Sequence, residues 1–282
     1  MAISRAQLVK ELEPGLNALF GLEYKRYDNQ HAEIYTNESS DRAFEEEVML
    51  SGFANAQVKG EGAGVSYDDA QETFTARYNH ETMALAFAIT EEAIEDNLYD
   101  RISSRYTKAL ARSMSNAKQV KAAAPLNNGL PAVDGFDSGD GVSLFNTAHT
   151  TVSGTNVSNT LTTQADLNET SLEQAMIDIS AMTDERGLRI AARALKMIVP
   201  PANQFNAERL MKSQGRTATA DNDINAIASM GMLPQGYRIN NFLTDTDSFY
   251  IITDVPNGMK MFTRTPLTTA MEGDFDTGNV RY

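Results

Sequence analysis

Residues 90–124 read TEEAIEDNLYDRISSRYTKALARSMSNAKQVKAAA, and no Gly or Pro interrupts this stretch. Apolar residues recur four apart along it, as at Leu98, Ile102, Tyr106 and Leu110, and Val120 widens this stripe. This is the pattern of one amphipathic helix with a single buried face. Acidic residues come first and lysines last, as the helix dipole favours. The helix is expected to end before Pro125. At 1.5 Å per residue it would be about 50 Å long, enough to span a whole domain.

The composition limits the functions that this chain can have. It has 282 residues, of which 41% are hydrophobic, and a net charge of −14. This length suits one large domain or two. Nucleic-acid-binding proteins normally carry a basic stripe, and acids interrupt the polar face of the long helix, which argues against direct DNA or RNA binding. The absence of cysteine excludes disulfides and thiolate metal sites. No apolar run reaches membrane-spanning length, and the first residues lack the pattern of a signal peptide.

The segments before the long helix predict an arm and a long hairpin. Residues 1–24 carry a short amphipathic pattern that Pro14 splits, which predicts two short helices or an irregular arm. Residues 44–77 offer two extended segments around a glycine-rich tip at 60–64. The apolar side chains of this hairpin are too few to form a core, so something else must cover them. Residues 82–89 predict a strand that leads into the long helix.

The second half of the chain predicts a compact α/β unit at residues 166–255. A helix capped by Asp166 or Asn168 is expected to close at Gly187. The apolar run at 194–199 has the length of a strand. The other expected elements are a helix after Pro200, strands at 237–242 and 249–252, and a strand-like return at 259–282.

No segment supplies a convincing cofactor or metal site. The glycines at 60–64 lack the dinucleotide-binding spacing and a following Lys-Ser/Thr, so they predict a flexible tip. Asp134, Asp137 and Asp140 lie in a Gly-rich loop, where calcium binding is the weaker alternative because their spacing does not match an EF-hand. Turn chemistry is the preferred interpretation of two further acidic groups. These are Asp221, Asn222 and Asp223, and Asp245 and Asp247.

One enzymatic alternative rests on His149. A hydrolase that used it with Ser143 or Ser153 would need a strained nucleophile turn, and the chain has no G-x-S-x-G. His31 and His80 lie in polar surroundings. We therefore expect no catalytic residue, no cofactor and no metal, and an interaction or structural protein rather than an enzyme.

Several segments, in order along the chain, resemble the major head subunits of tailed bacteriophages, and the Mu-type major head subunits are the most similar group. The segments are AFAITEEAIEDNLYDRISSRYTKALARSM (86–114), LFNTAHT (144–150), TDERGLRIA (183–191), LKMIVPP (195–201), TADNDINAIASMG (219–231) and TPLTTAMEGDFDTGNVRY (265–282).

The resemblance implies an α+β fold of the Hong Kong 97 capsid type. The implied parts are an N-terminal arm at 1–42, an extended E-loop at 43–82, a peripheral domain at 83–165 with its spine helix at 90–124, an axial domain at 166–255, and return strands of the peripheral domain at 256–282. It further implies a major capsid protein of the virion, assembled in the host cytoplasm as pentamers and hexamers. The shell would enclose DNA without sequence-specific binding, with no membrane. Implied partners are a separate scaffolding protein, a portal and minor capsid proteins.

The hairpin and one loop of the α/β unit are the expected contacts between subunits. The residues are Val48, Leu50, Phe53, Lys59, Tyr67, Phe74, Asp221, Asn222 and Asp223. Lys59 is the sole candidate donor for a covalent crosslink, and we interpret it as a solvated lysine. The alternatives are another phage structural protein, of a tube or a decoration, and a soluble hydrolase. The long helix argues against a tube protein, because tube proteins are mostly β.

Overall fold

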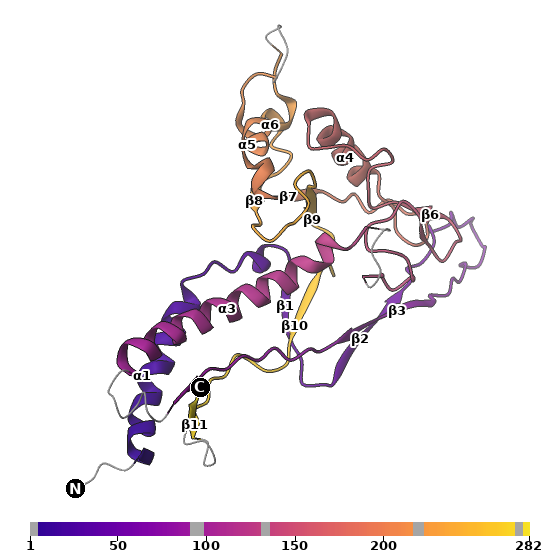
Figure 1. Cartoon of the computed structure of the whole chain (residues 1–282). Helices are drawn as coiled ribbons and strands as arrows, with labels where there is room; N and C mark the ends of the chain where they lie inside the picture. Colours follow the sequence, from indigo (N-terminus) through magenta and orange to yellow (C-terminus); the bar gives the residue numbers. More distant parts are fainter. Residues whose placement is uncertain (1–4, 91–98, 131–135, 217–222, 274–278) are drawn as a thin grey trace. The chain divides into compact units, whose positions relative to one another are not determined.

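The computed structural model describes residues 5–90, 99–130, 136–216, 223–273 and 279–282 (Figure 1). The fold mixes helices and strands, as expected, and divides into two compact units. Unit 1 comprises Met1–Asn29, His80–Ala122 and Thr263–Tyr282, and unit 2 comprises Gln30–Asn79 and Ala123–Phe262. No helix among the described residues is both long and apolar enough to cross a membrane.

The first helix of unit 1, α1 (Arg5–Lys25), is continuous through Pro14. The prediction of two short helices or an irregular arm is therefore wrong. An interior proline costs a helix about 3 kcal/mol. Leu16 and Phe20 follow it and are 6% and 4% exposed, in a cluster with Leu110 and Tyr282. Burying two such side chains contributes about 3–6 kcal/mol, which offsets the cost of the proline.

The long helix, α3 (Tyr99–Asn127), has 29 residues and continues through Pro125. The expected end before Pro125 is wrong because contacts within unit 2 hold the last turn. The Asn127 side chain donates to the Phe242 carbonyl (3.0 Å) and accepts from the Thr244 amide (3.0 Å), and the Tyr250 hydroxyl donates to the Leu126 carbonyl (2.8 Å). The expected start of the helix lies outside the described residues.

The buried face of α3 matches the predicted one only in part, since Leu110 is 8% exposed, as predicted. Leu98 and the side chain of Ile102 lie outside the described residues. Tyr106 and Val120, both assigned to the apolar stripe, are 54% and 51% exposed. Small or polar side chains are buried along the helix instead. They are Ser103, Thr107, Ala111, Ser115 and Gln119. Small side chains allow neighbouring segments to approach the helix closely, which the spacing of large apolar residues does not reveal.

Three short antiparallel strands complete unit 1. Their order is β11 (Glu272–Gly273), β12 (Val280–Arg281) and β4 (Ala88–Ile89). The strand expected at 82–89 is thus limited to its last two residues. The Tyr282 hydroxyl donates to Asn17 of α1 (2.9 Å), and its ring lies 5.6 Å from that of Phe87.

A second sheet forms the centre of the α/β part of unit 2. Strand β7 (Ala194–Val199) pairs in parallel with β8 (Tyr237–Ile239) and antiparallel with β9 (Tyr250–Thr253). The strand predicted at 194–199 is confirmed. Met197 and Val199 are fully buried, as expected for a central strand without polar alternation.

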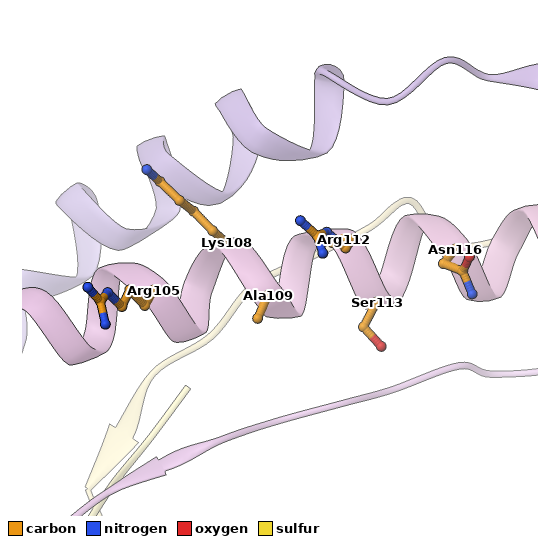
Figure 2. A pocket seen from close by; sticks show the side chains of 6 residues that line it. All are labelled: Arg105, Lys108, Ala109, Arg112, Ser113 and Asn116. Carbon is orange, nitrogen blue, oxygen red and sulfur yellow. The ribbon is translucent and has the colours of Figure 1, made fainter.

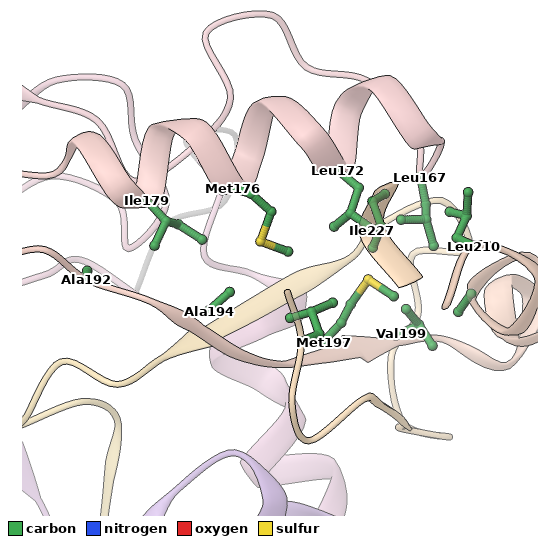
Figure 3. Close-up of a cluster of buried hydrophobic side chains, with 12 residues drawn as sticks. Leu167, Leu172, Met176, Ile179, Ala192, Ala194, Met197, Val199, Leu210 and Ile227 are labelled. Atoms are coloured by element: carbon green, nitrogen blue, oxygen red, sulfur yellow. The ribbon is translucent and has the colours of Figure 1, made fainter. Parts of the chain in front are cut away.

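Helices around this sheet supply the rest of its core (Figure 3). They are α4 (Glu169–Ala181), α5 (Gln204–Lys212) and α6 (Ala226–Met230). The short helix η2 (Pro201–Asn203) precedes α5 and buries none of its own residues. Asn168 caps α4, and Leu172, Met176 and Ile179 point from it into the core. The expected closure of this helix at Gly187 is wrong. The helix ends at Ala181, and Gly187 has φ +82° in a turn between bridged residues.

The remaining elements of unit 2 are short, apart from one hairpin. They are η1 (Gln30–Glu33), β1 (Thr36–Ser39) paired with β10 (Lys260–Thr263), and β5 (His149–Thr150) paired with β6 (Asn156–Val157). The hairpin joins β2 (Phe44–Leu50) and β3 (Glu72–Asn79) antiparallel, with a bulge between Val48 and Leu50. The two extended segments predicted at 44–77 are confirmed.

Candidate functional site

At the base of the β2–β3 hairpin, one face of the two strands contacts other residues of unit 2. Glu47 and Tyr78 lie on this face, because cross-strand neighbours share a face of a ribbon. Lys260 of β10 forms an ion pair with Glu47, and the Tyr78 ring lies 5.1 Å from Phe262. The hydrogen bond to Glu47 raises the pKa of Lys260. The base of the hairpin is thus anchored within its own unit.

The other face of the hairpin points into solvent. Phe44 and Val48 are 41% and 46% exposed. The Arg77 guanidinium lies 4.4 Å from the centre of the Phe44 ring and 2.5 Å from a carboxylate oxygen of Glu46. These pairs give the face a local order without covering its apolar surface.

Arg186 fixes the place where the hairpin becomes a loop. Its Nε donates to the Gly52 carbonyl (3.2 Å) and its Nη2 donates to the Asp69 carbonyl (2.7 Å). The backbone amide of Arg186 in turn donates to Asp184 (2.9 Å), which holds the turn. The two chain segments are also joined by the Ser51 amide, which donates to the Gln71 carbonyl (2.8 Å). We call this set of contacts the hairpin root.

Beyond the root, every residue from 52 to 72 is exposed. The apolar side chains are exposed by 60% at Phe53, 100% at Val58, 61% at Val65 and 94% at Tyr67. Exposed apolar groups that share one surface usually mark a contact with a partner. We call residues 52–72 the hairpin tip.

Of the predicted contact residues, the structure places most on this hairpin. Val48, Leu50, Phe53, Lys59 and Tyr67 are exposed on it. Phe74 is half-buried, and its Cβ would lie 3.4 Å from a Cβ built on Gly139 of the same unit. Asp223 is exposed near α6, while Asp221 and Asn222 lie outside the described residues. The contact of all these residues with other subunits stays a prediction.

The sequence reasoning missed other exposed residues of the same hairpin. Met49, Val58 and Val65 belong with the predicted set, and the argument from a segment without a core applies to them equally. Arg186 lies in one of the segments that carry the family resemblance, but nothing in its local pattern shows that it reaches Gly52.

His149 contacts an acid rather than either candidate serine. Its Nδ1 lies 2.7 Å from Oδ2 of Asp140, and its Nε2 is buried and has no hydrogen-bond partner among the described residues. Burial opposes ionisation of Asp140, but hydrogen bonds from Ser138 and His149 outweigh it and lower the pKa of the carboxyl. Ser143 donates to the Phe145 carbonyl, and Ser153 bonds with Thr151.

This arrangement bears on the two chemical alternatives, a serine hydrolase and a metal site. No described serine hydroxyl is hydrogen-bonded to His149, so the nucleophile–base contact of a hydrolase is missing among the described residues. Over the part of the chain that the structure describes, no three acidic or histidine side chains are grouped to hold a metal ion. Of the aspartates considered for calcium, Asp134 lies outside the described residues and Asp140 pairs with His149.

Known proteins provide a comparison for this geometry. The fold is similar to that of the bacteriophage JBD30 capsid decorated with minor capsid protein trimers, at 11% identity over 77% of this chain and 92% of that chain, with a TM-score of 0.56. A second structure of the JBD30 capsid gives 12% identity, 76% and 90% coverage and a TM-score of 0.54. The JBD30 procapsid gives 13% identity, 86% and 100% coverage and a TM-score of 0.50.

The sequence comparisons differ between single proteins and families. No curated protein matches the chain. The profile of a family described as phage capsid protein matches residues 44–282, which include the hairpin, α3 and the sheet of unit 2. The chain therefore belongs to the phage capsid protein family.

Proposed function

We propose that this phage capsid protein is the major subunit of an icosahedral head, and that it assembles as pentamers and hexamers around the phage genome. The hairpin tip is the observation that carries the proposal. Burying one large apolar side chain contributes about 1.5–3 kcal/mol, and Val58 and Tyr67 leave this contribution unused in a single chain. A neighbouring subunit that covers the tip would supply it, and a closed shell gives every copy such a neighbour.

In this proposal the parts of the chain follow the Hong Kong 97 arrangement. The β2–β3 hairpin is the E-loop at 43–82, and α3 is the spine helix. The arm comprises residues 1–42, the peripheral domain comprises 83–165 and 256–282, and the axial domain comprises 166–255. The antiparallel hairpin, the length of α3 and the likeness to the JBD30 capsid structures support this assignment. We further propose the Mu-type group as the subfamily, on the resemblance of the sequence segments.

The proposed role is mechanical rather than enzymatic. The contact of His149 with Asp140, in place of a serine, supports this view. The subunit would assemble in the host cytoplasm and remain in the virion. A separate scaffolding protein and a portal are proposed partners. The JBD30 capsid is decorated with minor capsid protein trimers, and we extend minor capsid proteins to this chain as proposed partners.

Electron microscopy of the purified full chain tests the proposal. We expect closed particles of uniform size, or ring-shaped capsomers, which form as the protein concentration rises. Light scattering on the same samples gives the mass. A monomer that stays stable at high concentration would contradict the proposed function, because its hairpin tip would then need no neighbour.

A further inference from the structure

The charge of α3 differs from that of the rest of the chain. Residues 101–124 contain basic residues and no acidic residue, within a chain of net charge −14. The basic residues are Arg101, Arg105, Lys108, Arg112, Lys118 and Lys121. The acids that argued against nucleic-acid binding all lie earlier, at Asp100 and before it. The later part of the helix is thus a basic segment in an acidic protein.

Three of these cations share one exposed face. Arg105, Lys108 and Arg112 are spaced three and four apart, so they are neighbours on the helix surface. Together with three small or polar residues they line a hollow of about 380 Å³ (Figure 2). The other lining residues are Ala109, Ser113 and Asn116. All six come from α3, and we call this surface the basic face.

The cations of α3 differ in whether they already contact other side chains of unit 1. Arg112 donates to the Tyr27 hydroxyl (3.3 Å), and this bond, with a smaller contribution from Glu23, raises the pKa of its guanidinium. Lys121, further along the helix, is paired with Glu81 at 2.7 Å. Within the described residues, no acidic side chain forms an ion pair with Arg105 or Lys108. The side chains of both are exposed to solvent, where an external anion can reach them.

We propose that the basic face binds the phosphate backbone of DNA without reading its sequence. This inference rests on the proposed function, because only a subunit of the genome-containing shell meets packaged DNA. Arginine guanidinium groups bind phosphate oxygens in pairs, and lysine adds a point charge. Ser113 and Asn116 are the kind of neutral side chain that also bonds to phosphate oxygens. From Arg105 to Arg112 the cations extend about 10 Å along the helix, which suits successive phosphates rather than one small anion.

The lining favours DNA over an acidic protein segment. Protein interfaces depend on large apolar or aromatic anchors in their centre. The described lining residues include no such side chain, since Ala109 is the one apolar residue among them. Side chains that carry charge and hydrogen-bond donors, with no anchor pocket, are typical of contacts that position a nucleic-acid backbone.

The test measures binding of a fluorescent 20-base-pair DNA duplex to the full chain, kept below the concentration at which it assembles. Anisotropy is recorded over a range of NaCl concentrations with two unrelated duplex sequences. Three phosphate contacts predict a slope of log affinity against log salt of about −2.7. We expect the same slope and affinity for both duplexes. The double variant R105E/K108E is expected to lose affinity about tenfold or more at low salt and about two-thirds of the slope.

Two further variants make the result specific. Arg193→Glu reverses one charge on an exposed residue of unit 2, and its affinity and salt slope are expected to equal those of the wild type. If R105E/K108E fails to fold, R105Q/K108Q removes the charges without reversing them and is expected to show the same loss of slope. A wild-type chain that ignores DNA at low salt, or a double variant that binds as well as the wild type, would overturn the inference.

Electron microscopy of the same samples separates this inference from the proposed function. Particles without measurable DNA affinity would defeat the basic-face proposal and leave the capsid function intact. Loss of particles in R105E/K108E, with no DNA affinity in the wild type, would show a contact between protein chains and would also overturn it. A wild-type chain that forms no particles would contradict the proposed function, whatever the anisotropy shows.

Discussion

At the scale of residues, Arg186 shows how one side chain can set the course of a long segment. Its guanidinium bonds to the carbonyls of Gly52 and Asp69, which belong to the two arms of one loop. Both bonds are exposed to solvent, so each contributes about 0.5–1 kcal/mol, the low end for hydrogen bonds in proteins. Together with the bond from the Ser51 amide to the Gln71 carbonyl and the bond from the Ala54 amide to the Asp68 carboxylate (2.7 Å), these two bonds limit how far the arms of the hairpin tip can separate.

Replacement of Arg186 by Ala is expected to loosen the hairpin root without unfolding unit 2. Proteolysis within residues 52–72 should become faster, while the melting temperature should fall by only a few degrees, about what 1–2 kcal/mol gives in a domain of this size. The cleavage rate of Arg186→Lys should lie between those of the wild type and Arg186→Ala, since an ammonium can donate to one carbonyl but not to both in the same geometry. Equal cleavage rates in all three proteins would show that the root does not depend on Arg186.

Asp140 and His149 give a prediction for pH. The pKa of Asp140 is lowered in the folded protein, so its contribution to stability is present above the unfolded value of about 3.9 and is lost as the pH falls through the folded value. Asp140→Asn should reduce the free energy of unfolding by about 1–3 kcal/mol at pH 7, because it leaves His149 with a weaker partner.

The difference in the free energy of unfolding between Asp140→Asn and the wild type should shrink below about pH 4, because the wild-type carboxyl then also takes up a proton. Asp137→Asn, at an exposed position in the same loop, is the control and should change stability by less than about 0.5 kcal/mol. Thermal melts between pH 3 and 7 make the comparison. If the stability difference between Asp140→Asn and the wild type stays constant over this range, the charge of Asp140 contributes nothing to stability.

Tyr67 carries the residue-scale prediction for assembly. It is 94% exposed in the single chain, so Tyr67→Ser should leave the melting temperature of the unassembled protein unchanged. In the shell the same change should raise the concentration needed for assembly by about tenfold, the equivalent of about 1.4 kcal/mol for one lost apolar contact. Tyr67→Phe keeps the ring and should assemble like the wild type. Light scattering as a function of concentration gives the assembly threshold of all three proteins. Equal thresholds would show that Tyr67 does not contribute to the contact between subunits.

At the scale of elements, α3 shows both the strength and the limit of sequence patterns. A long run without Gly or Pro predicts a long helix, and the described part of it is one. The predicted buried face is confirmed at Leu110. It fails at Tyr106 and Val120, because the spacing of large apolar residues selects these two, whereas the fully buried residues are Thr107 and Ala111. Close approach needs small side chains, and these have no apolar periodicity to detect.

Substitutions on α3 test the observed buried face. Leu110 is 8% exposed in the core of unit 1, and Leu110→Ala should lower the free energy of unfolding by about 2–5 kcal/mol. Val120 is 51% exposed on the same helix, and Val120→Ala should cost less than about 0.5 kcal/mol. Denaturant melts give both values. Equal costs would mean that the helix buries a face other than the one described.

At the scale of the whole molecule, the features that could be predicted from the sequence are those that a local pattern determines. The strand at 194–199 was predicted from one apolar run, and the hairpin was predicted from extended segments around glycines. Continuity of α1 through Pro14 could not be predicted, because it depends on burial of Phe20 against residues far along the chain. The hairpin root could not be predicted for the same reason, since Arg186 and Gly52 are distant in sequence. The exposed tip was predictable because its apolar residues have no core to join.

Hydrogen exchange on the hairpin tip tests the central claim, that a neighbouring subunit covers it. Of the described amides between residues 55 and 67, only the Ala63 amide donates to a described backbone acceptor, the Gly60 carbonyl at 3.1 Å. The amides of this segment should therefore exchange rapidly in the unassembled protein. In particles they should be protected by about a hundredfold or more, while the amides of β7 should be protected equally in both forms. Equal exchange of residues 55–67 in the two forms would contradict the account, because the tip would then gain no partner when the shell forms.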